Sequence, residues 1–257
     1  MNPREYEIMF AREEAYWWYR GMRRITRAFA PDLFSRRPLS WALDAGCGTG
    51  RNLEELDAGQ GPAAGIDTSL RALSLARRRG RDRLVCGSVE ALPFRSHAFA
   101  GVLCRDVLYM VPDEARAARE IARVLAPGGR LVLSSPAFAA LSGAHDRAVG
   151  GLRRHTAPGL AALLGEAGLR VARTTYANFF LAGPIWVLRK VTNALSRRRP
   201  SEDVSSDFGL APAPFEEILF SFLSVEARII ARARLPFGVT VFVAAAKPAQ
   251  GTSVAGK

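Results

Sequence analysis

Short apolar runs alternate with segments of helical periodicity along most of this chain. Seven runs of strand length are rich in aliphatic and aromatic residues, at 41–43, 63–66, 84–86, 99–104, 130–135, 169–176 and 239–246. Between them, apolar residues recur every three or four positions at 51–58, 68–79, 113–125 and 158–167. Strands that alternate with helices predict an α/β fold with a mostly parallel sheet covered by helices on both faces.

A glycine turn follows the first strand, in the stretch 41–50 that reads WALDAGCGTG. Asp44 closes the strand, and Gly46, Gly48 and Gly50 follow at alternate positions before a helical segment. Glycine tolerates positive φ and lets a ligand approach the backbone without a Cβ in the way. The second strand ends in Asp67, an acidic residue suited to the two hydroxyls of a ribose. The sequence therefore predicts a nucleotide-type ligand at this corner.

The flanks of this pattern suggest how the chain is divided. Residues 1–38 predict an N-terminal helical cap, 39–137 the Rossmann-like core, and 138–168 a second cap with a substrate loop and helix. Residues 169–247 hold the last strands around a helical insertion at 177–235, and 248–257 form a tail. We expect one of the adjacent Trp17 and Trp18 to pack on the sheet and the other to face a cleft, because helical neighbours lie about 100° apart.

Composition narrows the class of protein. The chain has 257 residues, and its net charge of +12 raises the possibility of nucleic-acid binding. Only three of its 36 basic residues are lysine, and the arginines are scattered, so we read them as solvated and expect no nucleic-acid partner. The three cysteines lack metal-ligand spacing, and 1–14 is charged throughout, so we predict a reduced, cytoplasmic protein without a metal.

In order and spacing, five segments resemble class I S-adenosylmethionine-dependent methyltransferases, namely LDAGCGTG, GID, GSVEALPF, FAGVLCRDVLYMV and EIARVLAPGGRLVLS. The flanks resemble a bacterial small-molecule subgroup, through EEAYWWYRGMRR near the N-terminus and the HD…RR motif HDRAVGGLRRHT in the cap. The resemblance implies a Rossmann-like seven-stranded sheet whose last strand enters antiparallel beside the sixth.

The same resemblance implies S-adenosyl-L-methionine as the cofactor and assigns its contacts. The methionine part would be held by Asp44, Gly46, Cys47, Gly48 and Gly50. The ribose would be bound by Asp67, with Thr68 beside it, and the adenine would be bordered by Ser88 and Val89. Arg105 would lie near the sulfonium. The chain departs from the family in three places. Ser88 stands where relatives often have Asp, which shifts the contact to the adenine amino group to Glu90 or a backbone carbonyl. Tyr109-Met110 stands where many relatives have Glu-His. Gly151 stands where the cap motif has its second histidine, and His155 where it has a tyrosine.

A hydroxyl acceptor needs a base as its oxygen is methylated. Our candidates are His145, His155 and Asp106, with a hydrogen-bonded His145-Asp146 loop pair as the alternative; His97 is expected to be structural. Candidate acceptor contacts are Tyr16, Trp18, Tyr19, Tyr109, Arg154, Tyr176 and Asn178. Arg153 and Arg154 would bind an anionic group or pair with N-terminal acidic residues, and Tyr176 and Asn178 would line the site or simply pack.

The resulting hypothesis is methyl transfer to a small hydrophobic or anionic acceptor, with O-methylation favoured over C- or N-methylation. The alternatives are a non-catalytic S-adenosylmethionine-binding regulator, a nicotinamide-dependent dehydrogenase and an RNA methyltransferase. A dehydrogenase would carry G-x-G-x-x-G, whereas this turn is G-x-G-x-G. The apolar insertion would cover the pocket, extend the core, or contact a membrane surface through 179–188.

Overall fold

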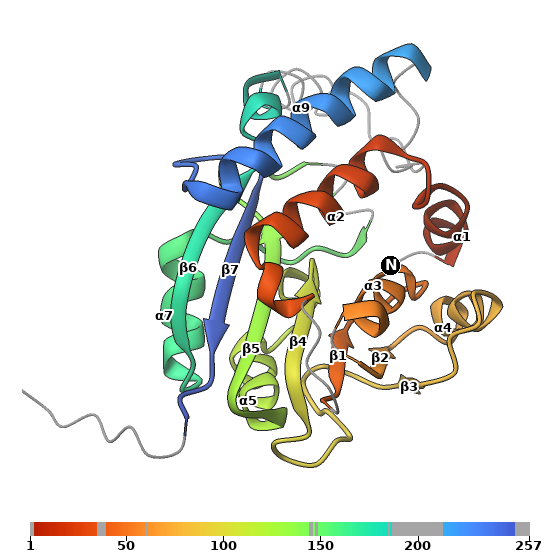
Figure 1. Ribbon diagram of the computed structural model, residues 1–257, viewed down its shortest axis with the longest axis vertical. Helices are drawn as coiled ribbons and strands as arrows, with labels where there is room; N and C mark the ends of the chain where they lie inside the picture. The colour runs from red at the N-terminus through yellow and green to blue at the C-terminus, as the bar shows by residue number, and fades with distance from the viewer. Residues whose placement is uncertain are drawn as a thin grey trace, which may run out of the picture.

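A seven-stranded mixed sheet organises the computed structural model, which describes residues 3–34, 40–59, 61–143, 146, 149–184, 186 and 213–249 (Figure 1). The strand order is β3-β2-β1-β4-β5-β7-β6. The strands are β1 (Ala42–Ala45), β2 (Ala63–Asp67), β3 (Leu84–Cys86), β4 (Phe99–Arg105), β5 (Leu125–Pro136), β6 (Arg170–Ala177) and β7 (Thr240–Ala246). The first five run parallel, and β7 is antiparallel to both β5 and β6. This confirms the predicted Rossmann-like fold with its antiparallel last strand.

Helices cover both faces of the sheet, as the alternation of strands and helices predicts (Figure 1). One core contains α5 (Glu114–Val124) and α7 (Ala157–Glu166), and the other contains α2 (Trp17–Phe29), α3 (Arg51–Gly59) and α9 (Ala213–Arg232). In β4, Val102 belongs to the first core and its neighbour Leu103 to the second, because successive strand side chains point to opposite faces. A strand buried on both faces reads as a continuous apolar run, which is the pattern of 99–104.

β5 begins earlier than predicted. The sequence placed its start at 130, because Pro127, Gly128 and Gly129 resemble the end of the preceding helix. In the structure Leu125 already pairs with Phe99, and the register shifts before Gly101 meets Arg130. Gly128 N donates to Lys247 O over 2.9 Å, so the end of β7 holds this turn in the sheet. The start of β5 is therefore set by its pairing with Lys247, which is distant in sequence, and could not be predicted from the local residues.

The N-terminal segment forms α1 (Pro3–Arg12) and α2, which lie above the ends of β1 and β4. Trp17 is 8% exposed within the core, whereas Trp18 lines a cavity, and their rings meet nearly at right angles with centroids 5.5 Å apart. This is the split expected of adjacent helical residues. The helix α4 (Leu70–Arg78) packs against α1 and is capped by Ser69.

α9 packs closely along α2 at a residue without a side chain. A Cβ added to Gly21 would lie 2.2 Å from Leu223 Cδ1, so glycine sets the distance between the two helices. The polar part of the insertion, 187–212, lies outside the described residues. Among the helices that the structure describes, none combines the length and the apolar content needed to cross a bilayer.

Candidate cofactor and acceptor site

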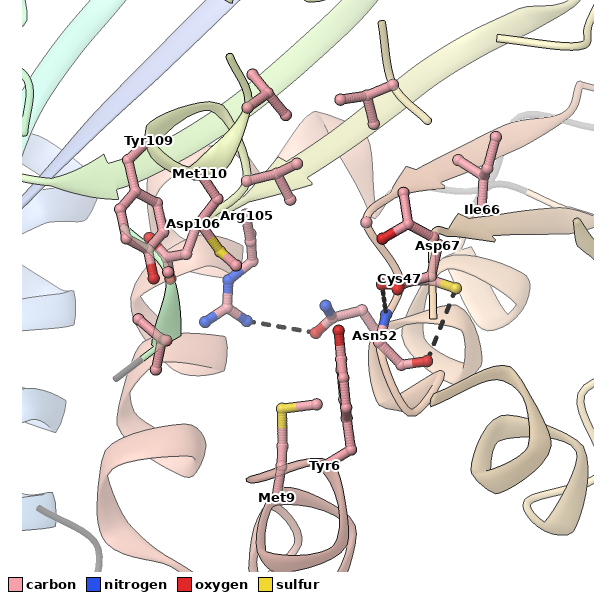
Figure 2. Close-up of a pocket in the computed structure, with 18 of the residues that line it drawn as sticks. Tyr6, Met9, Cys47, Asn52, Ile66, Asp67, Arg105, Asp106, Tyr109 and Met110 are labelled. Carbon is pink, nitrogen blue, oxygen red and sulfur yellow. Dashed lines mark hydrogen bonds between the residues drawn. The ribbon is translucent and has the colours of Figure 1, made fainter. Parts of the chain in front are cut away.

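A cavity of about 500 Å³ lies at the carboxyl ends of β1, β2 and β4, where a parallel α/β sheet normally binds its ligand (Figure 2). Its walls come from the turn after β1, the end of β2, the loop after β3, the segment after β4, α1, α2 and residues 149–150. We call the side around Asp67 and the glycine turn the donor half. The side around Trp18 and Tyr109 is the acceptor half.

The glycine turn brings bare backbone to the donor half. Gly46, Gly48 and Gly50 have φ values of 84°, 52° and 78°, a region in which other residues are strained. A Cβ on Gly46 would lie 2.2 Å from Val107 Cγ2, and one on Gly48 would lie 2.9 Å from Met9 Cε. Gly46 and Cys47 both donate their N–H to Ile66 O, which joins the turn to β2. Gly46, Cys47 and Gly48 line the cavity, whereas Gly50 packs close to Ala76 on α4.

Asp67 is fixed at the end of β2 by two backbone amides. Its Oδ2 accepts from Gly48 N and its Oδ1 from Ser69 N, each over 2.9 Å. Burial raises the pKa of this carboxyl, and the two backbone hydrogen bonds oppose that change. Each carboxylate oxygen keeps a further lone pair, and the side chain lines the cavity. The geometry suits a ligand with vicinal hydroxyls.

Two polar side chains at the donor half have buried atoms without a hydrogen-bond partner among the described residues; Asp44 lies in β1 outside the cavity wall, and Arg105 belongs to that wall. Asp44 is 1% exposed, its Oδ2 has no partner, and burial raises its pKa to about 7 while nearby Arg105 opposes the increase. Arg105 lines the cavity and donates from Nη1 to Asn52 Oδ1 over 3.3 Å, but its Nε has no partner. Such orphaned groups are costly unless a ligand completes them. An ammonium for Asp44 and a carboxylate for Arg105 are what an amino-acid moiety provides.

The loop after β3 completes the donor half. Thr68, Ser88 and Val89 line the cavity as predicted, and Glu90 lines it too. Ser88 Oγ accepts from Glu90 N over 3.1 Å and donates to the Glu90 carboxylate over 3.3 Å. The serine that replaces the family's aspartate therefore orients the neighbouring glutamate.

The acceptor half is built from α2 and from the segment after β4. Trp18, Tyr19, Asp106 and Tyr109 line it. Asp106 has a φ of 53° although it is not glycine, and it accepts from Ser134 Oγ over 3.1 Å. Left-handed backbone at such a residue is uncommon and clusters at functional sites.

Two departures from the family pattern meet in this half. A Cβ on Gly151 would lie 2.7 Å from Tyr109 Cε2, so only glycine leaves room for this ring. Leu152 N donates to Tyr109 O over 2.8 Å, which holds the two segments together. The substitutions at 109 and 151 are therefore coupled by packing.

His155 takes a place that contradicts the predicted catalytic role in the cavity. Its Nδ1 lies 2.7 Å from Ser135 Oγ and its Nε2 lies 2.6 Å from Glu114 Oε2, and the ring is not part of the cavity wall. With both ring nitrogens engaged, His155 joins β5 to α5. His145 lies outside the described residues.

The two cap arginines are also committed elsewhere. Arg154 binds Asp146 through two nitrogens, at 3.0 Å from Nε and 2.8 Å from Nη2, and donates to Ala137 O. Arg153 pairs with Glu114 over 3.3 Å. Neither lines the cavity. The expected choice between a substrate anion and the N-terminal acidic residues was wrong on both counts, because the partners are local to the cap and α5.

Three predicted acceptor contacts are packing residues. Tyr16 is 8% exposed within the core. The Tyr176 hydroxyl accepts from Ala157 N over 3.0 Å while its ring stacks on Phe138. Asn178 is fully buried and donates from Nδ2 to Thr240 Oγ1 over 3.1 Å. Neither Tyr176 nor Asn178 belongs to the cavity wall.

Sequence reasoning missed the residues that α1 and α2 bring over the cavity. These are Glu5, Tyr6, Met9, Glu13 and Arg23, and Asn52 joins them from α3. Glu13 is the first glutamate of the EEAYWWYRG segment, and its carboxylate accepts from Thr49 Oγ1 inside the glycine turn and pairs with Arg79 at 2.9 Å. The place of Glu13 in that motif was the sequence feature that could have predicted its position at the site. For Tyr6 and Met9 no pattern pointed to the site.

Comparisons with known proteins agree with this geometry. A family model described as "Methyltransferase domain" matches residues 43–133. The "Ubiquinone/menaquinone biosynthesis C-methyltransferase UbiE" of Serratia proteamaculans is 34% identical over 139 residues, 49% of this chain and 55% of that protein. The "Probable tRNA methyltransferase 9B" of Homo sapiens is 35% identical over 104 residues, 39% of this chain and 22% of that protein. The chain thus spans less than two thirds of either relative.

Solved structures extend the likeness to the whole fold. A Haloferax volcanii putative methyltransferase in complex with the Trm112 activator has a TM-score of 0.58 at 20% identity, over 95% of this chain and 96% of that one. The geranyl diphosphate C-methyltransferase of Streptomyces coelicolor, solved with S-adenosyl-L-homocysteine, has a TM-score of 0.59 at 15% identity, over 86% and 77%. Residues 43–133 therefore match a methyltransferase domain, and the strand order and the solved structures show that the chain has the fold of class I S-adenosylmethionine-dependent methyltransferases.

Proposed function

We propose that this protein transfers a methyl group from S-adenosylmethionine to a small-molecule acceptor. The observation that carries the proposal is a single cavity that joins the two halves, with Asp67 and the glycine turn on one side and Asp106 and Tyr109 on the other. A relative named for ubiquinone and menaquinone biosynthesis and a structural neighbour named for geranyl diphosphate support a small-molecule acceptor.

The donor half would hold the cofactor at three points. Asp67 would accept from the ribose hydroxyls, and Ser88, Val89 and Glu90 would border the adenine. Asp44 and Arg105 would complement the amino-acid part through their orphaned atoms. When bound, the cofactor supplies an electrophilic methyl group on a sulfonium, so the protein must mainly orient the acceptor and exclude water.

Asp106 is the candidate base for a hydroxyl acceptor. Its side chain lines the cavity just after β4, beside Arg105 (Figure 2), and this position supports the role. Ser134 Oγ donates to one carboxylate oxygen, which orients the group. Burial raises the pKa of Tyr109, so its phenol stays protonated and can donate a hydrogen bond to the acceptor. O-methylation therefore remains our first choice, before C- or N-methylation.

The acceptor wall favours a hydrophobic molecule over an anionic one. Trp18, Met110, Val111, Pro112 and Val149 present apolar surface to the cavity. Arg153 and Arg154, the predicted anion binders, pair with carboxylates away from it. An apolar pocket with a few fixed polar groups is typical of a small-molecule site.

The test is methyl transfer from labelled S-adenosylmethionine to a library of phenols, quinols, prenylated alcohols and amines, with transfer RNA as a further arm. We expect a hydrophobic hydroxyl compound to be methylated and RNA not. Asp106→Asn should lower kcat at least 100-fold with a cofactor Kd within about threefold of the unaltered protein. Binding of S-adenosylhomocysteine without transfer to any acceptor would favour the non-catalytic alternative, and labelled RNA the RNA methyltransferase.

A further inference from the structure

The outer side of α9 carries a stripe of large apolar residues that are exposed in the part of the chain that the structure describes. Phe215, Ile218, Phe222 and Val225 are 57%, 52%, 46% and 44% exposed. Their spacing of three, four and three residues places them on one side of the helix. The buried side of α9 is a different one, formed by Leu223, Ala227 and Ile230 against α2.

Residues from the insertion extend this stripe. The Phe180 ring lies 6.1 Å from that of Phe222 between centroids, and 41% of Phe180 is exposed. Trp186 is 48% exposed on the same segment. We call Phe180, Phe215, Ile218, Phe222 and Val225 the apolar face. An exposed cluster of this kind on a protein surface marks an interaction site more often than a chance arrangement.

The charge beside the apolar face is acidic at the start of α9, where Glu216 and Glu217 follow Phe215 and Glu217 pairs with Arg20, and basic toward its C-terminal end. From 218 to 249 the only acidic residue is Glu226, which is fully buried and accepts hydrogen bonds from Asn178 N and Phe179 N. The same stretch exposes Arg228, Arg232 and Arg234 around the C-terminal end of α9. An apolar face bordered by arginine complements an anionic phospholipid surface, which offers acyl chains and negative headgroups together.

The apolar face lies close to the acceptor half of the cavity. α9 packs along α2 at Gly21 and Leu223, and α2 carries Trp18 and Tyr19 into the acceptor half (Figure 1). A surface bound by α9 would therefore lie one helix away from the acceptor half. A hydrophobic acceptor dissolved in that surface would reach the cavity over a short distance.

We propose that the apolar face and its neighbouring arginines dock this protein peripherally on an anionic phospholipid membrane. The contact involves α9 as well as the 179–188 segment predicted from sequence. It does not depend on the proposed function, since the docking residues are separate from the cavity wall.

The experiment is co-sedimentation of the full chain with vesicles of phosphatidylcholine alone or mixed with phosphatidylglycerol. We expect binding to the mixed vesicles at 0.05 M salt and at least fivefold weaker partition at 0.5 M salt, because the Debye length shortens. Phe215→Ser/Ile218→Ser/Phe222→Ser should lower the partition coefficient at least tenfold. Leu70→Ser on α4, where the leucine is 72% exposed, is the matched control and should change nothing.

A charge variant, Arg228→Gln/Arg232→Gln/Arg234→Gln, keeps the apolar contacts and should lose most of the salt-dependent binding. Both triple variants should keep the Kd for S-adenosylhomocysteine, which shows that they fold. Absence of vesicle binding by the unaltered chain would overturn the proposal. So would binding of both triple variants as strong as that of the unaltered chain. A dimer in size-exclusion chromatography that the serine variant dissociates, without vesicle binding, would assign the face to a second copy.

Discussion

The donor half of the cavity is built on a backbone turn and on residues at strand ends, with Tyr6 and Met9 of α1 placed over them, whereas the acceptor half is built from the side chains of distant segments. Gly46, Cys47, Gly48 and Asp67 come from two adjacent strands joined by hydrogen bonds. Trp18 and Tyr109 come from α2 and from the turn after β4, and Gly151 in the cap makes room for the Tyr109 ring. In the proposed function, local geometry would hold the cofactor, and packing between distant elements would hold the acceptor.

Asp67→Ala should give the largest effect on the donor half. The change removes the carboxylate that accepts from Gly48 N and Ser69 N and that would accept from the ribose hydroxyls. Two lost charge-assisted hydrogen bonds correspond to about 3 kcal/mol, or at least about 100-fold in the Kd for S-adenosylhomocysteine by calorimetry. The control is Asp82→Ala, an exposed carboxyl outside the cavity. Near-normal affinity of the Asp67 variant would move the ribose elsewhere.

Gly46→Ala should show how tightly the donor half is packed. Gly46 and Gly128 both have positive φ, but the new Cβ at 46 would collide with Val107, while at 128 it would meet open space. We expect the free energy of unfolding to fall by about 3 kcal/mol at Gly46 and about 1 kcal/mol at Gly128. Urea unfolding measures both.

Val107→Ala added to Gly46→Ala should recover part of the loss. Equal losses at the two glycines, with no recovery, would show that backbone strain alone matters in this turn.

His155→Ala tests whether the cap supplies structure or chemistry. Loss of the ring leaves the fully buried Ser135 hydroxyl without this partner and leaves Glu114 paired with Arg153 alone. The free energy of unfolding should fall by about 2 kcal/mol, with the Kd for S-adenosylhomocysteine within about twofold. His97→Ala, at an exposed position, should cost less than about 0.5 kcal/mol. Unchanged stability with a large loss of turnover would restore the catalytic role.

The smallest effect concerns pH. Because burial raises the pKa of Asp44 to about 7, this carboxyl is mostly protonated at pH 6 in the free protein. An ammonium group of the cofactor favours the ionised form, so binding at pH 6 must release a proton and is weaker than at pH 7.5. We expect the affinity for S-adenosylhomocysteine to rise about fivefold between these values. Asp44→Asn should flatten the profile, and a profile unchanged in that variant would mean that another group titrates.

The fold was predictable because each of its strands is a short apolar run next to a helical pattern. The start of β5 was not, because Lys247 at the far end of the chain holds the turn at Gly128. In the cap, the histidines and arginines of 145–156 suggested a catalytic or substrate-binding role, but long-range contacts decide which way such side chains point. His155 reaches Ser135 and Glu114, and Arg154 folds back on Asp146. The cavity residues of α1, such as Tyr6 and Met9, carry no signal until the helix is placed.

The place of β7 has a consequence for synthesis of the protein on the ribosome. In the described sheet β6 is an edge strand whose neighbour is β7, and β7 is translated after the other six strands of that sheet. Until Thr240–Ala246 emerges, β5 exposes an unpaired edge and β6 has no place in the sheet. A chain that stalls before 240 should therefore be prone to aggregation and proteolysis, although its whole donor half has already been made.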